Sequence, residues 1–179
     1  HSNIHTQNTD TYLNTVPSLT VHVDGSRTDT YTEDGGFTKP YKTVQAAIDS
    51  ITGANVNSPY IIMVAPGNYN EDLVLKTWVS LRGYVKESTQ ISTNTGEHLC
   101  TFPDGGRVTI HNIHLGDAGQ SLTFTHPPGA SGGTSVWLDN VSVGNVTANF
   151  LGGGVDYLRC RNDCIFNGTL TVHAGQLTA

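Results

Sequence analysis

The chain has 179 residues, a formal net charge of −6, 36% hydrophobic residues and only 13% charged residues. Its 24 threonines, 14 asparagines and 20 glycines favour strands and turns over long helices. No cluster of lysines or arginines occurs along the sequence, so the phosphate attraction that most nucleic-acid-binding proteins use is missing. No run is apolar for long enough to span a membrane. We therefore expect one all-β domain, with no nucleic-acid partner and no membrane insertion.

The N-terminal part of the sequence divides into an arm, a strand and a helix. Residues 1–18 are polar and follow neither the helical nor the strand period, which indicates an arm or linker that becomes ordered against a partner. Alternating apolar residues at 19–23 predict a first strand, and we assign residues 19–179 to one domain. Apolar residues at helical spacing predict a helix over about 42–52, which Gly53 would end.

The rest of the chain consists of short strands and turns, and part of it repeats. Three segments share the order apolar, variable, apolar, polar, Asn, variable, variable, apolar; they are 108–115, 136–143 and 158–165. Their asparagines are Asn112, Asn140 and Asn162, and Gly83 takes the same place 29 residues before Asn112. A shorter strand with a central threonine follows each segment. Repeats of strand, corner, strand and loop at this spacing indicate a parallel β-solenoid.

The repeated asparagines have a physical explanation in such a fold. A corner between two strands requires a sharp bend, and Asn tolerates the left-handed backbone conformation better than other residues with a side chain. In stacked coils, Asn112, Asn140 and Asn162 would form a ladder in which each amide satisfies the next, and Gly83 would make the same bend without a side chain. The alternative is an ordinary β-sandwich with these asparagines in its hairpin turns.

Several motifs between residues 19 and 92 resemble a known family. They are "VDGS", "KPYKTVQAAIDSI", "PYIIMVAPGNYNEDLVL", "VSLRGY" and "TQIS". They are similar to the N-terminal part of the pectin-lyase-like right-handed parallel β-helix, particularly in the pectin methylesterases. The resemblance implies a single-stranded right-handed parallel β-helix with one N-terminal capping α-helix. The apolar side of that helix, with Ala46, Ala47, Ile48 and Ile51, would then belong to the core.

The sequence offers no catalytic set. Pectin methylesterases resemble one another in downstream motifs such as "QDTL", "DFIFG" and "GRPW", and none of them occurs here. Asp139 and Asp163 could lie on adjacent coils as a glycosidase pair, whereas His111 and His114 would face opposite sides of a strand and make a poor metal pair. Solvated side chains on the outer wall account for all four residues. We expect no enzymatic activity, no metal and no cofactor, and three cysteines that are small buried residues.

These observations favour a structural role outside the cell. The leader "HSNIHTQNTDTYLNT" is similar to segments of bacteriophage virion proteins, and phage spikes and fibres commonly use trimeric β-helices. We expect a non-enzymatic virion structural or adhesion protein, as a tail spike, fibre or capsid appendage. It would form a homotrimer and dock on other virion proteins through its N-terminal arm. The alternative is a carbohydrate-active β-helix protein, either an enzyme similar to pectinesterases or polysaccharide lyases or a polysaccharide-binding module. We expect the protein on the surface of a phage particle or, otherwise, secreted.

Exposed aromatic residues are the candidates for binding a host surface polysaccharide, because rings stack on the apolar faces of sugars. Trp137 alternates with apolar neighbours and is expected to point away from the core. Tyr31, Tyr41 and Phe37, in the long loop before the helix, are the other candidates. For Trp137 the alternative is burial between protomers or beneath a loop.

Overall fold

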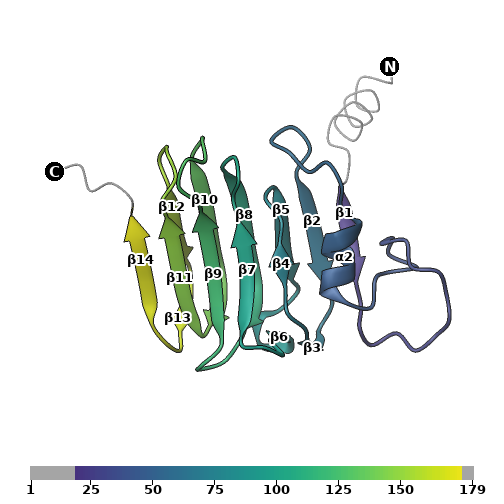
Figure 1. Cartoon of the computed structure of the whole chain (residues 1–179). Coiled ribbons are helices and arrows are strands. Elements are labelled where there is room, and N and C mark those ends of the chain that lie inside the picture. The colour runs from purple at the N-terminus through teal and green to yellow at the C-terminus, as the bar shows by residue number, and fades with distance from the viewer. Residues whose placement is uncertain (1–18, 175–179) are drawn as a thin grey trace, which may run out of the picture.

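A computed structural model describes residues 19–174, and it is a parallel β-solenoid of about four turns with one α-helix (Figure 1). The predicted β-helix is therefore confirmed, and the β-sandwich alternative is wrong. The proposed arm, residues 1–18, lies outside the described residues. The elements in chain order are β1 (Thr20–Val23), α2 (Val44–Ser50), β2 (Tyr60–Val64), β3 (Gly67–Asn70), β4 (Val74–Leu75), β5 (Val79–Gly83), the short 3₁₀ turn η1 (Lys86–Ser88), β6 (Thr89–Ser92), β7 (Glu97–Thr101), β8 (Gly106–Leu115), β9 (Ser121–His126), β10 (Thr134–Val143), β11 (Asn145–Phe150), β12 (Tyr157–Arg161), β13 (Ile165–Phe166) and β14 (Leu170–Ala174).

The strands form two parallel sheets that face each other across one core. The first sheet has the main order β1-β2-β5-β8-β10-β12, and the second has the order β14-β11-β9-β7-β4. Residues one coil apart stand in register, as in the pairs Val136 with Val108 and Val146 with Leu122. Side chains that point inward are apolar and buried at nearly every coil, because a strand presents alternate residues to its two faces.

The helix α2 covers the N-terminal end of the solenoid, beside β1 and β2 (Figure 1). Val44, Ala47 and Ile48 are fully buried, as the capping role requires, but Ala46 is only half-buried and is not part of the core. The helix is shorter than the predicted 42–52, because Ile51 is already extended. The Nζ of Lys76 donates to the carbonyl oxygens of Ile48 and Ile51 at 2.8 and 3.0 Å, so a side chain satisfies this helix end before Gly53 is reached.

The motif "PGNYNE" fastens this helix to the first coil. The carboxylate of Glu71 accepts hydrogen bonds from the backbone nitrogens of Val44 and Gln45 at 2.8 and 2.7 Å. A negative charge at the first turn satisfies two free N–H groups and complements the helix dipole. The hydroxyl of Tyr69 donates to the carbonyl oxygen of Ala65 at 2.9 Å. Glu71 and Tyr69 of this motif therefore both have structural roles at the solenoid end.

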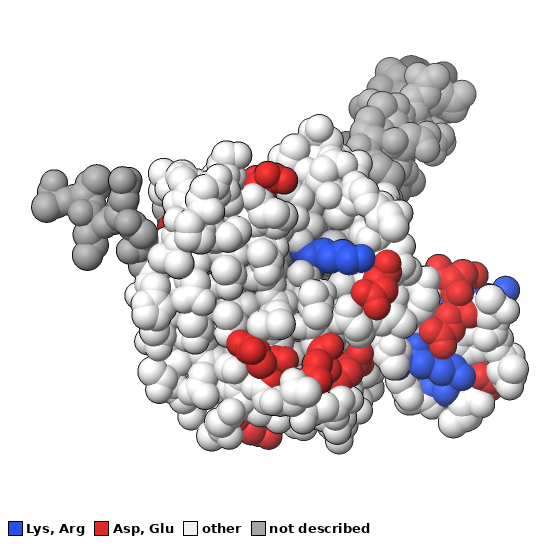
Figure 2. Space-filling view, viewed as in Figure 1, with Lys and Arg blue, Asp and Glu red and all other residues white. Residues whose placement is uncertain are grey.

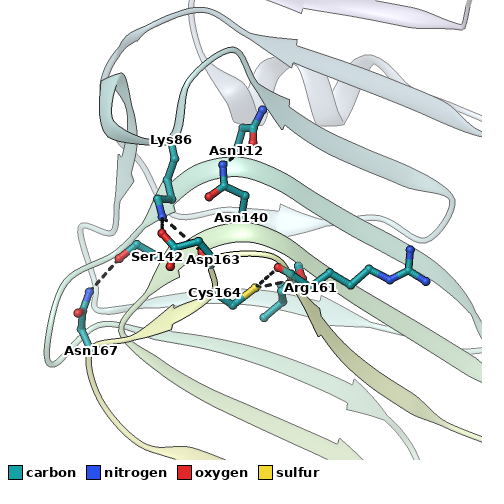
Figure 3. A network of polar contacts seen from close by, with 9 residues as sticks. Lys86, Asn112, Asn140, Ser142, Arg161, Asp163, Cys164 and Asn167 are labelled. Atoms are coloured by element: carbon teal, nitrogen blue, oxygen red, sulfur yellow. Dashed lines mark hydrogen bonds and ion pairs between the residues drawn. The ribbon is translucent and has the colours of Figure 1, made fainter.

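The repeated asparagines form corners, within β8 and β10 for Asn112 and Asn140 and between β12 and β13 for Asn162. Asn112, Asn140 and Asn162 have φ angles of 54°, 53° and 52°, the left-handed conformation that the sequence predicts for them. The Nδ2 of Asn140 donates to the Oδ1 of Asn112 at 2.7 Å, which gives one rung of the expected ladder (Figure 3). Inside a protein, such an amide pair both satisfies its polar atoms and fixes the register of adjacent coils.

Two details of the predicted ladder are wrong. Asn162 donates to the carboxylate of Asp139 instead of to Asn140, so the amide ladder has one rung. Gly83 is not among the residues with positive φ. A glycine is required at this position because there is no room for a side chain: a Cβ atom there would lie 2.2 Å from the carbonyl oxygen of Asn112. The next coil passes too closely over β5 for any side chain at this position.

A lysine from an early coil reaches the last corner. The side chain of Lys86 in η1 is buried, and its Nζ lies 2.6 Å from the Oδ2 of Asp163 and 3.3 Å from the carbonyl oxygen of the same residue (Figure 3). These residues are 77 positions apart in the sequence. The contact ties the coil of β5 and β6 to the coil of β12 and β13 across the corners between them.

The last described coil differs from the coils before it, because no residue among 19–174 packs on its far side. Its inward positions are exposed or half-buried, as at Leu170 and Val172 with exposures of 46% and 52%. Cys160 is exposed and Cys164 half-buried for the same reason, so the expectation of three buried cysteines is correct only for Cys100. Burial raises the pKa of the Cys100 thiol to about 12 and keeps it inert.

Among residues 19–174, no helix is long and apolar enough to cross a membrane.

Candidate functional site

The two sheets differ sharply on their outer faces. The outer side of the second sheet, which we call the threonine face, carries the row Thr123, Thr147 and Thr171 on β9, β11 and β14. Glu97 is the one Asp, Glu, Lys or Arg residue in the five strands of this sheet. Figure 2 shows this side of the molecule, with few basic side chains over the strands. The strands of this face therefore carry little charge.

The outer side of the first sheet carries most of the arginine of the chain. Four of the five arginines point outward from β5, β8 and β12; they are Arg82, Arg107, Arg159 and Arg161. The parallel register brings them together, because Arg82 stands beside His111 and Arg161 stands beside Asp139. We call this surface the arginine face. Basic residues that are scattered along the sequence thus form a cluster in the fold.

None of these four arginines forms an ion pair within residues 19–174, and all four side chains are exposed. Two of the other cations are paired: Arg27 pairs with Asp29 at 2.6 Å, and Lys86 pairs with Asp163. The arginine face is therefore a concentration of uncompensated positive charge in a chain of net charge −6. Such a surface attracts an anion, and the planar guanidinium group suits carboxylate or sulfate oxygens.

Trp137 lies at the centre of three of these arginines. The Cζ atoms of Arg161, Arg107 and Arg159 lie 4.5, 5.0 and 5.6 Å from its ring centroid. Trp137 points outward, as the sequence predicts, and is half-buried. Its Nε1 is buried and has no hydrogen-bond partner within the described chain. Each guanidinium gains a cation–π contact, so the ring holds the three arginines around itself.

A trough lies beside Trp137 on the same face. Small side chains on adjacent strands, Ser80 and Thr109, form its floor next to the larger Ile61, and Trp137 follows Thr109 in the same outward row on the next strand. One half has a volume of about 340 Å³ and the other of about 220 Å³, and both share these floor residues. The first half is lined by Val56, Pro59, Tyr60, Ile61, Trp78, Ser80, Arg107 and Thr109, and the second by Ile61, Ser80, Leu81, Arg82, Thr109 and His111. An arginine thus stands at each end of a hydroxyl-lined floor.

The second tryptophan of the chain lines the Arg107 end of this trough. Trp78 has a φ of 64°, a conformation that is rare for a bulky residue with a side chain. Two backbone hydrogen bonds hold this conformation. The nitrogen of Trp78 donates to the carbonyl oxygen of Arg107 at 2.7 Å, and the nitrogen of Tyr60 donates to the carbonyl oxygen of Trp78 at 2.8 Å. The bend presents the indole ring to the trough, next to Tyr60. Tyr60 also borders this end, although its side chain packs against the core.

The acidic and histidine residues that the sequence singled out do not form one site. The Nδ1 of His111 lies 3.2 Å from the Oδ2 of Asp139 at the Arg82 end of the trough. Asp163 is instead paired with Lys86 around the corner, and His114 lies 2.9 Å from Asp117. Asp139 also accepts from Asn162, so its carboxylate is already satisfied. Within residues 19–174, no group of three His, Cys, Asp or Glu residues could hold a metal ion.

The aromatic residues of the long loop lie apart from Trp137. The loop packs against β1, whereas Trp137 is on β10, and three strands separate the two in the sheet. The hydroxyl of Tyr31 donates to the carbonyl oxygen of Pro40 at 3.0 Å, and its ring lies between Arg27 and Lys42. Tyr41 is half-buried and packs against the core. Phe37 is 75% exposed and contacts His22 edge-on. Tyr31 and Tyr41 therefore do not share a site with Trp137.

Sequence reasoning missed most of the residues that line the trough. Trp78, Tyr60 and the arginines were not singled out, because nothing in the linear pattern brings them together. The outward positions of the repeated segments were the available signal. Aligning the segments on their asparagines places Thr109, Trp137 and Arg159 in one outward row.

A scan against protein-family models, a search of curated proteins and a search of solved structures found no match to this chain.

Proposed function

We propose that this β-helix is a non-enzymatic adhesion module that binds a glycan in the trough of the arginine face. The trough beside Ile61 and Trp137 is the observation that carries the proposal. It combines a floor of hydroxyl groups, the tryptophan Trp78 at one end and arginines at both ends. Sugar-binding sites use the same combination, because rings cover apolar sugar faces while polar groups satisfy the hydroxyls.

The dimensions of the trough suit an extended chain. Arg107 lies at one end, and Arg82, which stands in register with His111, lies at the other. Residues 107 and 111 of β8 are four positions apart, which corresponds to about 13 Å along a strand. The trough is open along its length and rests on the backbone of a rigid parallel sheet. A site on regular strands needs little ordering when a ligand binds, which favours affinity.

A glycan array tests this function with a matched pair of variants. Thr109→Trp fills the floor of the trough, whereas Thr123→Trp adds the same side chain to the threonine face; both threonines are half-buried and point outward on successive strands. The wild type and Thr123→Trp should bind the same glycans, and Thr109→Trp should bind none of them. The proposal fails if the wild type binds no glycan, or if Thr109→Trp binds as the wild type does.

The setting that we propose for this module is the surface of a bacteriophage particle, as part of a spike, fibre or capsid appendage. The β-helix suits an extended shaft, and the N-terminal sequence resembles segments of virion proteins. We propose a homotrimer whose copies pack through the threonine face, because that face carries a row of β-branched threonines and little charge. Size-exclusion chromatography with light scattering should give three times the mass of 19.1 kDa. A monomer at micromolar concentration would contradict the trimer.

The second candidate is a carbohydrate-active enzyme, and one contact favours it. His111 lines the trough, and Asp139 lies 3.2 Å from its Nδ1. A carboxylate that orients an imidazole is a common arrangement for a general base. Esterase and lyase assays on the glycans that bind should distinguish the two candidates. Turnover that His111→Gln removes would establish the enzyme, and binding without turnover would support the adhesion module.

A further inference from the structure

We propose that the ligand of the arginine face is an acidic polysaccharide, whose carboxylate or sulfate groups pair with the arginines around Trp137 and at the ends of the trough. This inference rests on the proposed function and names the ligand class of the same site. Four exposed arginines without an acidic partner lie within one set of adjacent strands; they are Arg82, Arg107, Arg159 and Arg161. A neutral glycan would form no ion pair with any of these arginines.

The surroundings of the arginines favour an external anion over an internal one. Asp139 is the acidic residue within the strands of this face, and His111 and Asn162 already occupy its carboxylate. The opposite face of the solenoid carries no comparable cluster, because its five strands contain neither lysine nor arginine. The positive charge is thus confined to one side of an acidic protein. A polyanion would therefore bind there in one orientation rather than coat the molecule.

Trp137 is a positioning residue in this arrangement. The sequence suggests a bare ring that stacks on sugars, but three guanidinium groups already lie within 5.6 Å of its centroid. Arginine side chains on an open sheet surface are otherwise free to sample many rotamers. Contact with one ring restricts Arg107, Arg159 and Arg161 to a shared region, which reduces the entropy lost when an anionic chain binds.

The geometry favours a polysaccharide over a nucleic acid. Single-stranded nucleic acids are held by a basic groove with free aromatic rings on which successive bases stack. Here the most central ring, Trp137, is occupied by arginines, and the trough floor of Ser80 and Thr109 is suited to hydroxyl groups.

Binding to defined polymers tests the ligand class. Isothermal titration at physiological salt would use alginate as the carboxylated probe, dextran sulfate as the sulfated probe, neutral dextran, and oligo(dT). We expect binding to alginate or dextran sulfate, and whichever binds identifies the acidic group. Arg107→Gln and Arg161→Gln should each weaken it by about tenfold, the usual contribution of a charge-assisted hydrogen bond. Lys39→Gln removes one exposed charge from the N-terminal loop and should leave the affinity unchanged.

The role of Trp137 has a readout of its own. Trp137→Phe keeps an aromatic ring and should retain most of the affinity, whereas Trp137→Leu should weaken binding several-fold. The dependence on salt concentration should stay the same in Trp137→Leu, because the same number of arginines meets the ligand. A lower salt dependence in that variant would contradict the positioning role.

Three results would overturn the acidic ligand. They are equal binding of neutral dextran with no effect of the arginine variants, tighter binding of oligo(dT) than of both acidic polysaccharides, and no binding of either acidic polysaccharide. The first result would leave glycan adhesion standing, since the trough would then hold a neutral chain. The absence of all glycan binding on the array would remove both proposals.

Discussion

The arginine face and the threonine face are built from the same coils but have opposite surfaces. Their inward residues are equally apolar and buried, as Val136 and Leu138 are on β10 and Val146 and Ala148 are on β11. Their outward residues share little: one face has four arginines and two tryptophans beside a trough, and the other has rows of threonine. The comparison shows that the inward rows determine the fold, while the outward rows are free to differ.

The largest expected effect is the loss of stability in Gly83→Ala, at the edge of the arginine face. The new Cβ would meet the carbonyl oxygen of Asn112 at 2.2 Å, and backbone must move to relieve the clash. We expect a loss of about 3 kcal/mol in the free energy of unfolding, measured by urea denaturation. Gly67→Ala is the control, because its Cβ would be in ordinary contact at 3.4 Å. Equal effects of the two substitutions would contradict this account.

Acid should destabilise the sheet under the threonine face and leave the arginines charged. His98, on β7, is buried, and burial lowers its pKa from 6.5 to about 4. The unfolded chain therefore binds a proton before the folded chain does, and stability falls as the pH drops from 6.5 to 4. The loss should reach about 3 kcal/mol at pH 4, measured as the free energy of unfolding.

The matched controls for this pH effect are two asparagine substitutions. His98→Asn should reduce the fall in stability between pH 6.5 and 4, whereas His173→Asn, at an exposed position on β14, should leave it unchanged. A free energy of unfolding that is equal at pH 7 and pH 4.5 in the wild type would show that His98 is not held neutral by burial.

The corner of β10 should respond to substitution by a smaller amount. Asn140→Leu puts an unsuited side chain at a φ of 53° and removes the hydrogen bond to Asn112. We expect a loss of about 2 kcal/mol and a lower melting temperature. Asn140→Gly relieves the backbone and should cost less than Asn140→Leu. A melting temperature that Asn140→Leu does not change would contradict the structural role of the corner.

The smallest expected effect on stability concerns the threonine face. Thr147→Arg places a charge in the middle of its threonine row, where the side chain points outward. The free energy of unfolding should change by less than about 0.5 kcal/mol, as for most surface substitutions. The trimer proposed above should nevertheless dissociate, which light scattering would detect. A trimer that persists would show that the copies pack through another surface.

The sequence predicts the coils and their corners because both depend on local signals. Alternation marks the inward residues, and the left-handed preference of Asn marks the bends at 112, 140 and 162. Two contacts depend instead on how loops of unequal length stack: the hydrogen bond that Asn162 donates to Asp139, and the ion pair of Lys86 with Asp163. No local pattern encodes that stacking.

The candidate site was less predictable than the fold for the same reason. Trp137 could be identified as outward from its own strand, but its arginine neighbours come from β8 and β12. The trough exists only because Ser80 and Thr109 happen to be small on neighbouring coils. Trp78 gave no signal before its bend was known, since a positive φ is unexpected for tryptophan.

Both tryptophans of the chain lie on the arginine face, so their indole N–H groups report directly on the central claim. Proton–nitrogen correlation spectra of the labelled protein should contain two indole signals, which substitution of Trp78 or Trp137 assigns. Titration with short oligosaccharides of the acidic polymer that binds should shift both signals and leave the backbone signals of Thr123 and Thr147 in place. Saturable shifts on the threonine face, with both indole signals unmoved, would contradict the account.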